Sequence, residues 1–384
     1  MSARGVLSFN VYDGCLEAIV HGYKDGFLRP EEYANLVQCD SLSDLKSQLQ
    51  VTDYGNFLQQ DGQGQLTARL IVERGQEHYV NQLRELRSWA APPLSHFLDF
   101  ISYEYMIANV LKLIIAKRSG RDGMQLLTRC HPLGWFPELA SLTAAADVRE
   151  MFEVVLIDSP IGRFFSSGGD FESDLDELSV EYIQGMLMKN YYEQFYDLCC
   201  TLGGATAEVM CPLLELEADL GVLRATVNTM GVAGIHPVDR RRLFPNFGSL
   251  VDLHDDIAES ENVEQLRERV RRFGLMYELL DDSRHGSSGL NSNSHASKPA
   301  GGSRKGGAAS GSSTVTAAGG SSMERRFVDV TVGLYRDALR RQFQYGVFYA
   351  WVKLKELEVS NLHWIADCIS QGMMHRVDEY VNIF

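Results

Sequence analysis

The chain has 384 residues, of which 45% are hydrophobic, enough to bury a core in one large domain or in two to three smaller lobes. Its 51 acidic residues outnumber its 36 basic residues, and the formal net charge is -15. This balance argues against nucleic acid and anionic lipid as primary ligands, since both require a basic surface.

The sequence shows no membrane-spanning or targeting segment. The longest apolar stretch, 106–116, is interrupted by Lys112 and is shorter than the ~20 residues that a membrane span requires. The residues before Asp13 include one basic residue and no apolar core, so neither a secretory signal nor a transit peptide is expected. We therefore expect a cytosolic protein without direct membrane insertion.

Helix start signals recur along the first third of the chain. Pro30 is followed by two glutamates, and Ser41-Leu42-Ser43-Asp44 resembles a capping box. The pair Pro92-Pro93 precedes a long apolar-periodic run that ends near Lys117. Each of these signals predicts the beginning of a helix.

A further helix is predicted over about 179–202 and ends at Gly203-Gly204. Short pieces such as 9–12 are the only candidates for strands, and no alternation of helices and strands at parallel-sheet spacing is present. The predicted fold class is therefore all-α. One face of the predicted helix is expected to be buried, because its apolar residues recur at steps of three and four: Ile183, Leu187, Tyr191, Phe195 and Leu198.

Residues 283–322 form a Gly- and Ser-rich segment without hydrophobic anchors, and we interpret it as a disordered surface insert in a single domain spanning 1–384. A docking or modification site among its Ser, Thr and basic residues is the alternative to a solvated loop.

Three apolar helical stretches, 109–114, 219–224 and 361–366, each begin with Asn or Asp followed by Leu or Val. Their starts are separated by 110 and 142 residues, and the second separation falls to 102 when the 40-residue insert is left out. Three similar helical lobes are one interpretation of this spacing. Chance recurrence among amphipathic helices is the other.

Motifs for catalysis or nucleotide binding are missing. The sequence lacks a phosphate-binding loop, a zinc-protease His-Glu-x-x-His, a Gly-x-Ser-x-Gly elbow and a dinucleotide fingerprint. The best remaining candidates are Cys130 beside His131, and His96 three residues before Asp99, but neither pair has a visible third partner. We therefore predict no catalytic, cofactor-binding or metal-binding residue and no cofactor.

Aromatic residues concentrate in 343–351, near the C-terminus. Such a tract could anchor a partner protein. Packing in the core is the favoured interpretation, because large aromatic side chains contribute most when they are buried.

Long strings of the sequence resemble subunit d of the eukaryotic V-type proton ATPase, which is related to a central-stalk component of the archaeal-type ATPase. The resemblance covers nearly the whole chain except the insert and a divergent stretch over 253–280. It rests on specific strings, among them Thr52-Asp53-Tyr54-Gly55-Asn56-Phe57-Leu58, Cys130-His131-Pro132-Leu133-Gly134, Met210-Cys211-Pro212, Leu243-Phe244-Pro245 and Trp364-Ile365-Ala366-Asp367-Cys368-Ile369.

The resemblance implies a three-lobed, pseudo-threefold helical funnel made of three similar repeats. It also implies a non-catalytic connector between the central-stalk subunits of the ATP-hydrolysing sector and the proteolipid ring, within a hetero-oligomeric complex. Such a complex would lie on the cytosolic face of acidic organelles such as vacuoles, endosomes or lysosomes, with the plasma membrane as a further candidate. An all-helical cytosolic scaffold unrelated to proton pumping is the alternative.

Carried over from the family, the assembly and coupling candidates are His131, Trp364, Asp367 and Cys368, with helix packing as the alternative role for each. The family usually has Glu where Asp367 stands, which puts any contact needing the longer side chain in doubt. Seven cysteines without a Cys-x-x-Cys pair indicate mostly reduced, buried thiols. Because Cys39, Cys130 and Cys368 fall in family-like strings, we predict that some pair of them is close and oxidisable.

Overall fold

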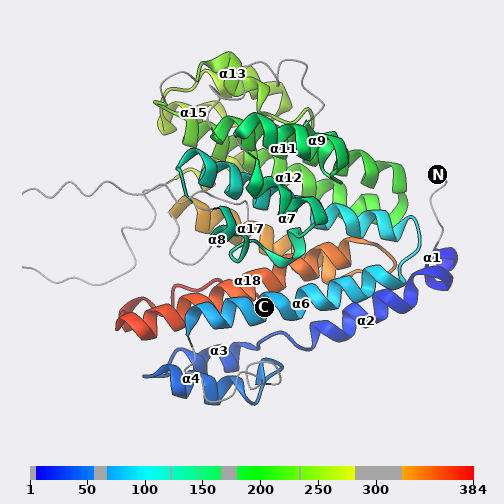
Figure 1. Ribbon diagram of the computed structural model, residues 1–384, viewed down its shortest axis with the longest axis vertical. Helices are drawn as coiled ribbons and strands as arrows, with labels where there is room; N and C mark the ends of the chain where they lie inside the picture. The colour runs from blue at the N-terminus through cyan, green and yellow to red at the C-terminus, as the bar shows by residue number, and fades with distance from the viewer. Residues whose placement is uncertain are drawn as a thin grey trace, which may run out of the picture.

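The computed structural model describes residues 6–55, 67–121, 123–145, 147–165, 180–232, 235–281 and 322–384, and throughout these ranges the fold is all-α, as predicted (Figure 1). The long helices are α6 (Ala68–Trp89), α7 (Leu94–Arg118), α11 (Val180–Leu202), α12 (Gly204–Thr229), α17 (Ser322–Arg340) and α18 (Gly346–Gln371). In the described ranges no helix is both long and apolar enough to cross a membrane.

Shorter helices connect and cover the long ones. The α-helices among them are α1 (Val6–Tyr12), α2 (Gly14–Lys24), α3 (Pro30–Leu36), α4 (Leu42–Leu49), α8 (Gly123–Leu127), α9 (Val148–Asp158), α10 (Gly162–Phe165), α13 (Pro237–Arg242), α14 (His254–Ala258), α15 (Val263–Arg269) and α16 (Gly274–Leu279). The 3-10 turns are η1 (Pro132–Gly134), η2 (Pro137–Leu139), η3 (Ser141–Ala144), η4 (Val251–Leu253) and η6 (Met374–Arg376).

The predicted helix starts are confirmed. Pro30 is the first residue of α3, where its missing N–H costs nothing. Ser41 caps α4, because its hydroxyl accepts a hydrogen bond from the backbone N–H of Asp44 at 3.2 Å. Helix α7 follows Pro93 directly and ends one residue beyond Lys117. The strand suggested for 9–12 is wrong, because these residues belong to α1.

Helix α11 agrees with the predicted helix to within one residue at its start. Ile183, Leu187, Tyr191 and Phe195 are all fully buried, but the next buried position is Cys199, and Leu198 is only half-buried. The buried stripe thus advances by four residues at every step. Gly203, with φ of 65° and ψ of -166°, then lets the chain turn directly into α12.

Helix α18 lies at the centre of the fold, packed against α6, α17 and α2 (Figure 1). Every residue from Gln344 to Val359 is buried, which includes the aromatic residues of the tract at 343–351 from Tyr345 onward. The core interpretation of that tract is therefore confirmed. Gly75 of α6 allows the close approach to α18, since a Cβ at this position would lie 2.7 Å from Cγ2 of Val359.

Buried hydrophobic side chains form three clusters among the described residues. The largest joins α6, α7, α11 and the first half of α18. A second joins α3 and α4 to the last third of α18. The third joins α12 to α13–α16 and includes apolar residues from one end to the other of the divergent stretch over 253–280. That stretch is therefore helical and contributes to a core, although its sequence departs from the family pattern.

The predicted insert at 283–322 lies outside the described residues except for its last position. Ser322 is the first residue of α17.

Candidate functional site

Helix α18 carries five polar side chains in its buried part, which we call the α18 polar residues: Lys353, Lys355, Glu356, Glu358 and Asn361. Successive residues of an α-helix are rotated by about 100°, so these side chains point to several sides of α18. Burying a charged group is costly unless it is paired and hydrogen-bonded. Each of the five has such partners on other segments of the chain.

The first pair of contacts joins α18 to α7. Lys353 donates a hydrogen bond to Glu104 at 2.7 Å, and the Tyr105 hydroxyl donates one to Glu356 at 2.9 Å. Burial raises the pKa of Glu356 to about 7, despite the opposing effect of Lys353. Burial disfavours the charged form of Lys353, but Glu104, Glu356 and Glu217 together raise its pKa, so it remains a cation.

A second carboxylate joins three helices. Glu217 of α12 accepts hydrogen bonds from the hydroxyls of Tyr335 on α17 and Tyr349 on α18, at 2.5 and 2.7 Å. Burial raises the pKa of Glu217, which the two tyrosine hydrogen bonds and Lys353 only partly offset. Four long helices, α7, α12, α17 and α18, are thus tied together by hydrogen bonds in the interior.

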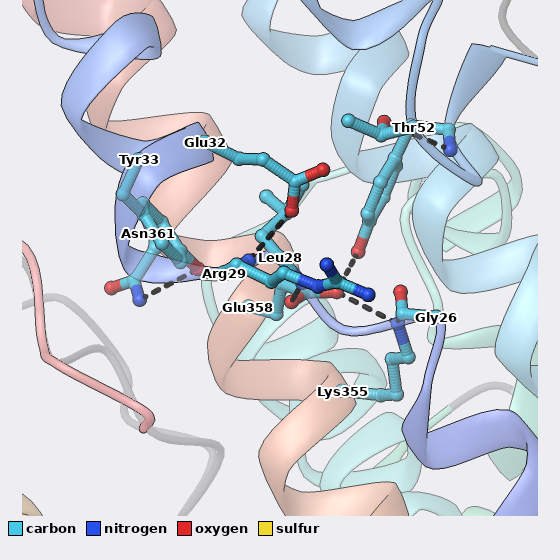
Figure 2. A network of polar contacts seen from close by, with 10 residues as sticks. Gly26, Leu28, Arg29, Glu32, Tyr33, Thr52, Lys355, Glu358 and Asn361 are labelled. Carbon is cyan, nitrogen blue, oxygen red and sulfur yellow. Dashed lines mark hydrogen bonds and ion pairs between the residues drawn. The ribbon is translucent and has the colours of Figure 1, made fainter.

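Glu358 ties α18 to the N-terminal part of the chain (Figure 2). Its two oxygens accept hydrogen bonds from the backbone N–H of Leu28 at 2.7 Å and from the Tyr54 hydroxyl at 2.6 Å. Lys355 donates to Glu358 at 2.8 Å and to the carbonyl of Gly26 at 2.7 Å. The loop between α2 and α3 is therefore held against α18 by both members of a buried ion pair.

Asn109 of α7 and Asn361 of α18 make the same pair of hydrogen bonds to a later segment. The Asn109 side chain accepts from the N–H of His131 at 2.8 Å and donates to its carbonyl at 3.0 Å. The Asn361 side chain accepts from the N–H of Val381 at 3.0 Å and donates to its carbonyl at 2.7 Å. Both asparagines are fully buried, so each one satisfies backbone groups that have no access to water.

Asp219 occupies the corresponding place on α12 and also holds a later segment. Its carboxylate accepts hydrogen bonds from the backbone N–H groups of Ser249 at 3.0 Å and Leu250 at 3.1 Å. Burial raises the pKa of Asp219 to about 6, and these backbone hydrogen bonds only partly oppose the shift. Asn109, Asp219 and Asn361, which begin the three similar sequence stretches, therefore act alike, and we call them the Asx anchors.

His131, the first predicted site residue, lies in a closed environment. Its Nδ1 accepts a hydrogen bond from the N–H of Leu133 at 3.2 Å, which places the proton of the neutral ring on Nε2, 2.8 Å from the Tyr79 hydroxyl. The ring stacks on Tyr105 with the centroids 4.4 Å apart. Burial, with Lys112, Lys353 and Arg84 nearby, lowers the pKa of His131 to about 3. The imidazole is therefore neutral at physiological pH and fixes the local backbone.

His131 is also linked to the centre of the fold, because Tyr105 stacks on its ring and bonds to Glu356 of α18. Asp99, which the sequence pairs with His96 as a candidate for catalysis, already forms an ion pair. It accepts two hydrogen bonds from the guanidinium of Arg87, at 2.6 and 2.9 Å.

Trp364, Asp367 and Cys368 lie together near the end of α18. The indole N–H of Trp364 donates to the carbonyl of Arg376 at 3.1 Å, and the guanidinium of Arg376 lies over the indole ring at 5.1 Å. Asp367 is half-buried, with a carboxylate oxygen 3.4 Å from Nε2 of His363. Cys368 is fully buried. Trp364 thus holds the C-terminal segment, and Trp364 and Asp367 are the members of the group that are partly exposed.

The three predicted redox cysteines divide between two cores. Cys39 and Cys368 belong to the cluster of α3, α4 and α18, and Cys130 packs against the largest cluster. Burial raises the pKa of all three thiols. Within this set, Cys39 and Cys368 are therefore the pair that shares a core, and their oxidation stays a prediction.

The polar residues inside α18 were not predicted as a site, although the sequence held a signal. Charged residues at 353, 355, 356 and 358 are spread around the helix among apolar neighbours, so no single solvent-facing side could expose them all. Such a pattern indicates a helix that is buried on every side and paired through its charges.

Comparisons with known proteins agree over almost the whole chain. A model of the ATP synthase (C/AC39) subunit family matches residues 16–380. The V-type proton ATPase subunit d of Dictyostelium discoideum is 36% identical over 381 residues, which are 99% of this chain and 97% of the relative. A probable V-type proton ATPase subunit d of Oryza sativa subsp. japonica is 35% identical over 99% of both chains, and the subunit d of Saccharomyces cerevisiae is 32% identical over 98% of this chain and 99% of its own. The chain therefore belongs to the V-type proton ATPase subunit d family, whose members are subunits of a hetero-oligomeric complex.

Proposed function

We propose that the chain is the non-catalytic connector of a rotary proton pump, joining the central stalk to the proteolipid ring. The match to the V-type proton ATPase subunit d family carries this proposal. It is supported by buried hydrogen bonds from α18 to α7, to α12 and to the segment around 26–28, with α17 joined through Glu217 of α12. A part that transmits torque must not deform between its two attachment surfaces. Close packing, together with buried charged groups that are hydrogen-bonded across helices, makes a stiff body.

The mechanism requires binding and rigidity, and no chemical step by this chain. The stalk, turned by ATP hydrolysis elsewhere in the complex, would rotate the connector, and the connector would rotate the proteolipid ring. His131 fits a positioning role, because its pKa of about 3 keeps it out of proton transfer near neutral pH. The proposed location is the cytosolic face of an acidic organelle, with the chain associated with the membrane indirectly, through the proteolipid ring.

The Asx anchors support a three-lobed body made of three repeats. Each anchor lies on a long helix and bonds a segment that follows it by 20 to 31 residues. A buried polar residue that makes the same kind of backbone hydrogen bond at three places is a more specific sign of a repeat than the recurrence of apolar residues. We propose that a single funnel-shaped domain spans 1–384, with 283–322 as an insert.

His131, Trp364, Asp367 and Cys368 are proposed to support assembly and coupling. His131 and Trp364 would act by holding the segments that follow α7 and α18. Asp367, which is partly exposed, is the member placed to contact another protein of the complex.

The test is affinity purification of the tagged chain from native membranes in mild detergent, together with depletion of the chain. We expect proteins of the proteolipid ring and the central stalk to co-purify, and ATP-driven acidification to be lost on depletion. Recovery of the chain alone, with acidification intact after depletion, would instead favour a helical scaffold unrelated to the pump.

A further inference from the structure

Two cysteines on neighbouring helices approach each other at the surface. The Sγ atoms of Cys200, in the last turn of α11, and Cys211, in α12, lie 3.4 Å apart. The two helices pack along each other and are joined by Gly203 alone (Figure 1). A disulfide bond is ~2.05 Å long, so the sulfurs need to approach by roughly 1.4 Å to be joined.

The helices are held together on the next turn by other contacts. The Tyr196 hydroxyl donates to Glu215 at 2.7 Å, and the Tyr196 ring stacks on Phe247 with the centroids 4.2 Å apart. Tyr196 lies four residues before Cys200, and Glu215 lies four residues after Cys211. The thiols are thus kept near each other by an arrangement that does not depend on them.

The two thiols differ in their access to solvent. Cys200 is exposed and Cys211 is half-buried, whereas the adjacent Cys199 is fully buried in the largest core cluster. Burial and the neighbouring Cys200 thiol raise the pKa of Cys211 to about 12. Cys200 is therefore the sulfur that meets an oxidant first, and Cys211 is placed to react with it next.

We propose that Cys200 and Cys211 are a redox-modification site, at which a peroxide converts the two thiols into a disulfide that closes the α11–α12 hairpin. The Cys200 thiolate attacks one peroxide oxygen, the O–O bond breaks, and Cys200 becomes a sulfenic acid. The departing hydroxide takes up the proton that the thiol had released and becomes water. The Cys211 sulfur then attacks the Cys200 sulfur, the S–O bond breaks, and a second water leaves. The two thiols lose two hydrogens and two electrons, and the peroxide is reduced to two waters.

The test uses the reduced full-length chain, treated with hydrogen peroxide, alkylated and digested. Trypsin leaves Cys199, Cys200 and Cys211 on one peptide, because no Lys or Arg lies between Lys189 and Arg224. A protease that cleaves after glutamate separates them at Glu208, so that only a disulfide holds the two peptides together.

We expect joined peptides in the unsubstituted chain, in Cys199→Ala and in Cys15→Ser, which removes another exposed thiol. Separate peptides are expected in Cys200→Ser and Cys211→Ser. Oxidation should also raise Tm by a few degrees or so in the unsubstituted chain and not in these two variants. Full alkylation of both thiols after oxidation of the unsubstituted chain, or peptides that stay joined in Cys200→Ser, would overturn the proposal.

Discussion

The segments that follow α7 and α12 are each held by a buried side chain that bonds to their backbone, an amide in one case and a carboxylate in the other. After α7, Asn109 meets one N–H and one carbonyl of His131, and an amide can bond to both. After α12, Asp219 meets two N–H groups, and a carboxylate accepts from both. The side chain at each anchor is therefore matched to the backbone groups that it must satisfy. Asn109 does not titrate, but His131, which it holds, has a lowered pKa, whereas the pKa of Asp219 is raised, so the stabilities of the two sites should respond to pH in opposite ways.

The largest effect is expected at the anchor of α18. Asn361→Leu removes both hydrogen bonds to Val381 and leaves a buried N–H and a buried carbonyl without partners. We expect a loss of about 4 kcal/mol in the free energy of unfolding, roughly equal at every pH. Urea denaturation measures it. A loss below about 0.5 kcal/mol would show that water reaches the Val381 backbone and that the anchor is not needed.

The next largest effect is the pH dependence of stability at His131, the residue that Asn109 of α7 holds. The pKa of His131 is about 3 in the folded chain and ~6.5 when unfolded, so the unfolded state binds more protons between these values. Stability at this site is complete above pH 6.5 and is lost as the pH falls, by about 3 kcal/mol at pH ~4.5. His131→Gln, which does not titrate, should remove this part of the acid sensitivity. Parallel urea titrations of the two proteins against pH measure it, and curves that stay parallel would contradict a buried neutral imidazole.

A smaller effect of opposite sign is expected at the α12 anchor. The pKa of Asp219 is raised from 3.8 to about 6 in the folded chain, so here the folded state binds more protons. Stability at this site is complete below pH ~3.8 and falls as the pH rises through 6, by about 3 kcal/mol in total. The difference between the unsubstituted chain and Asp219→Asn should show this slope between pH 4 and pH 7. A difference in the free energy of unfolding that does not change with pH would mean that Asp219 behaves as an ordinary surface carboxylate. Asp252→Asn, at an exposed position, serves as the control.

What the sequence predicted well was local. The start of α4 at Ser41 and the end of α11 at Gly203 depend on residues within a few positions of the helix terminus. Errors arose where a short pattern fits two periods, as at 9–12, or where steps of three and four compete, as at Leu198 and Cys199. The family resemblance supplied the function class, which no local pattern contains.

The sequence could not predict which residues far apart along the chain pair with one another. Lys353 meets Glu104 across 249 positions, and the N–H of Leu28 meets Glu358 across 330. No periodicity links residues so far apart, since only the packing of the helices brings them together. The Cys200 and Cys211 pair was missed for a related reason, because a search for Cys-x-x-Cys does not reveal thiols on facing helices.

The most direct test of the connector account is to measure ATP hydrolysis and proton uptake in the same membrane vesicles, with the chain depleted and then restored. We predict that depletion abolishes ATP-driven proton uptake, that the unsubstituted chain restores it, and that Asn361→Leu, added in equal amount, restores less. Proton uptake per ATP that is unchanged by depletion would contradict the account.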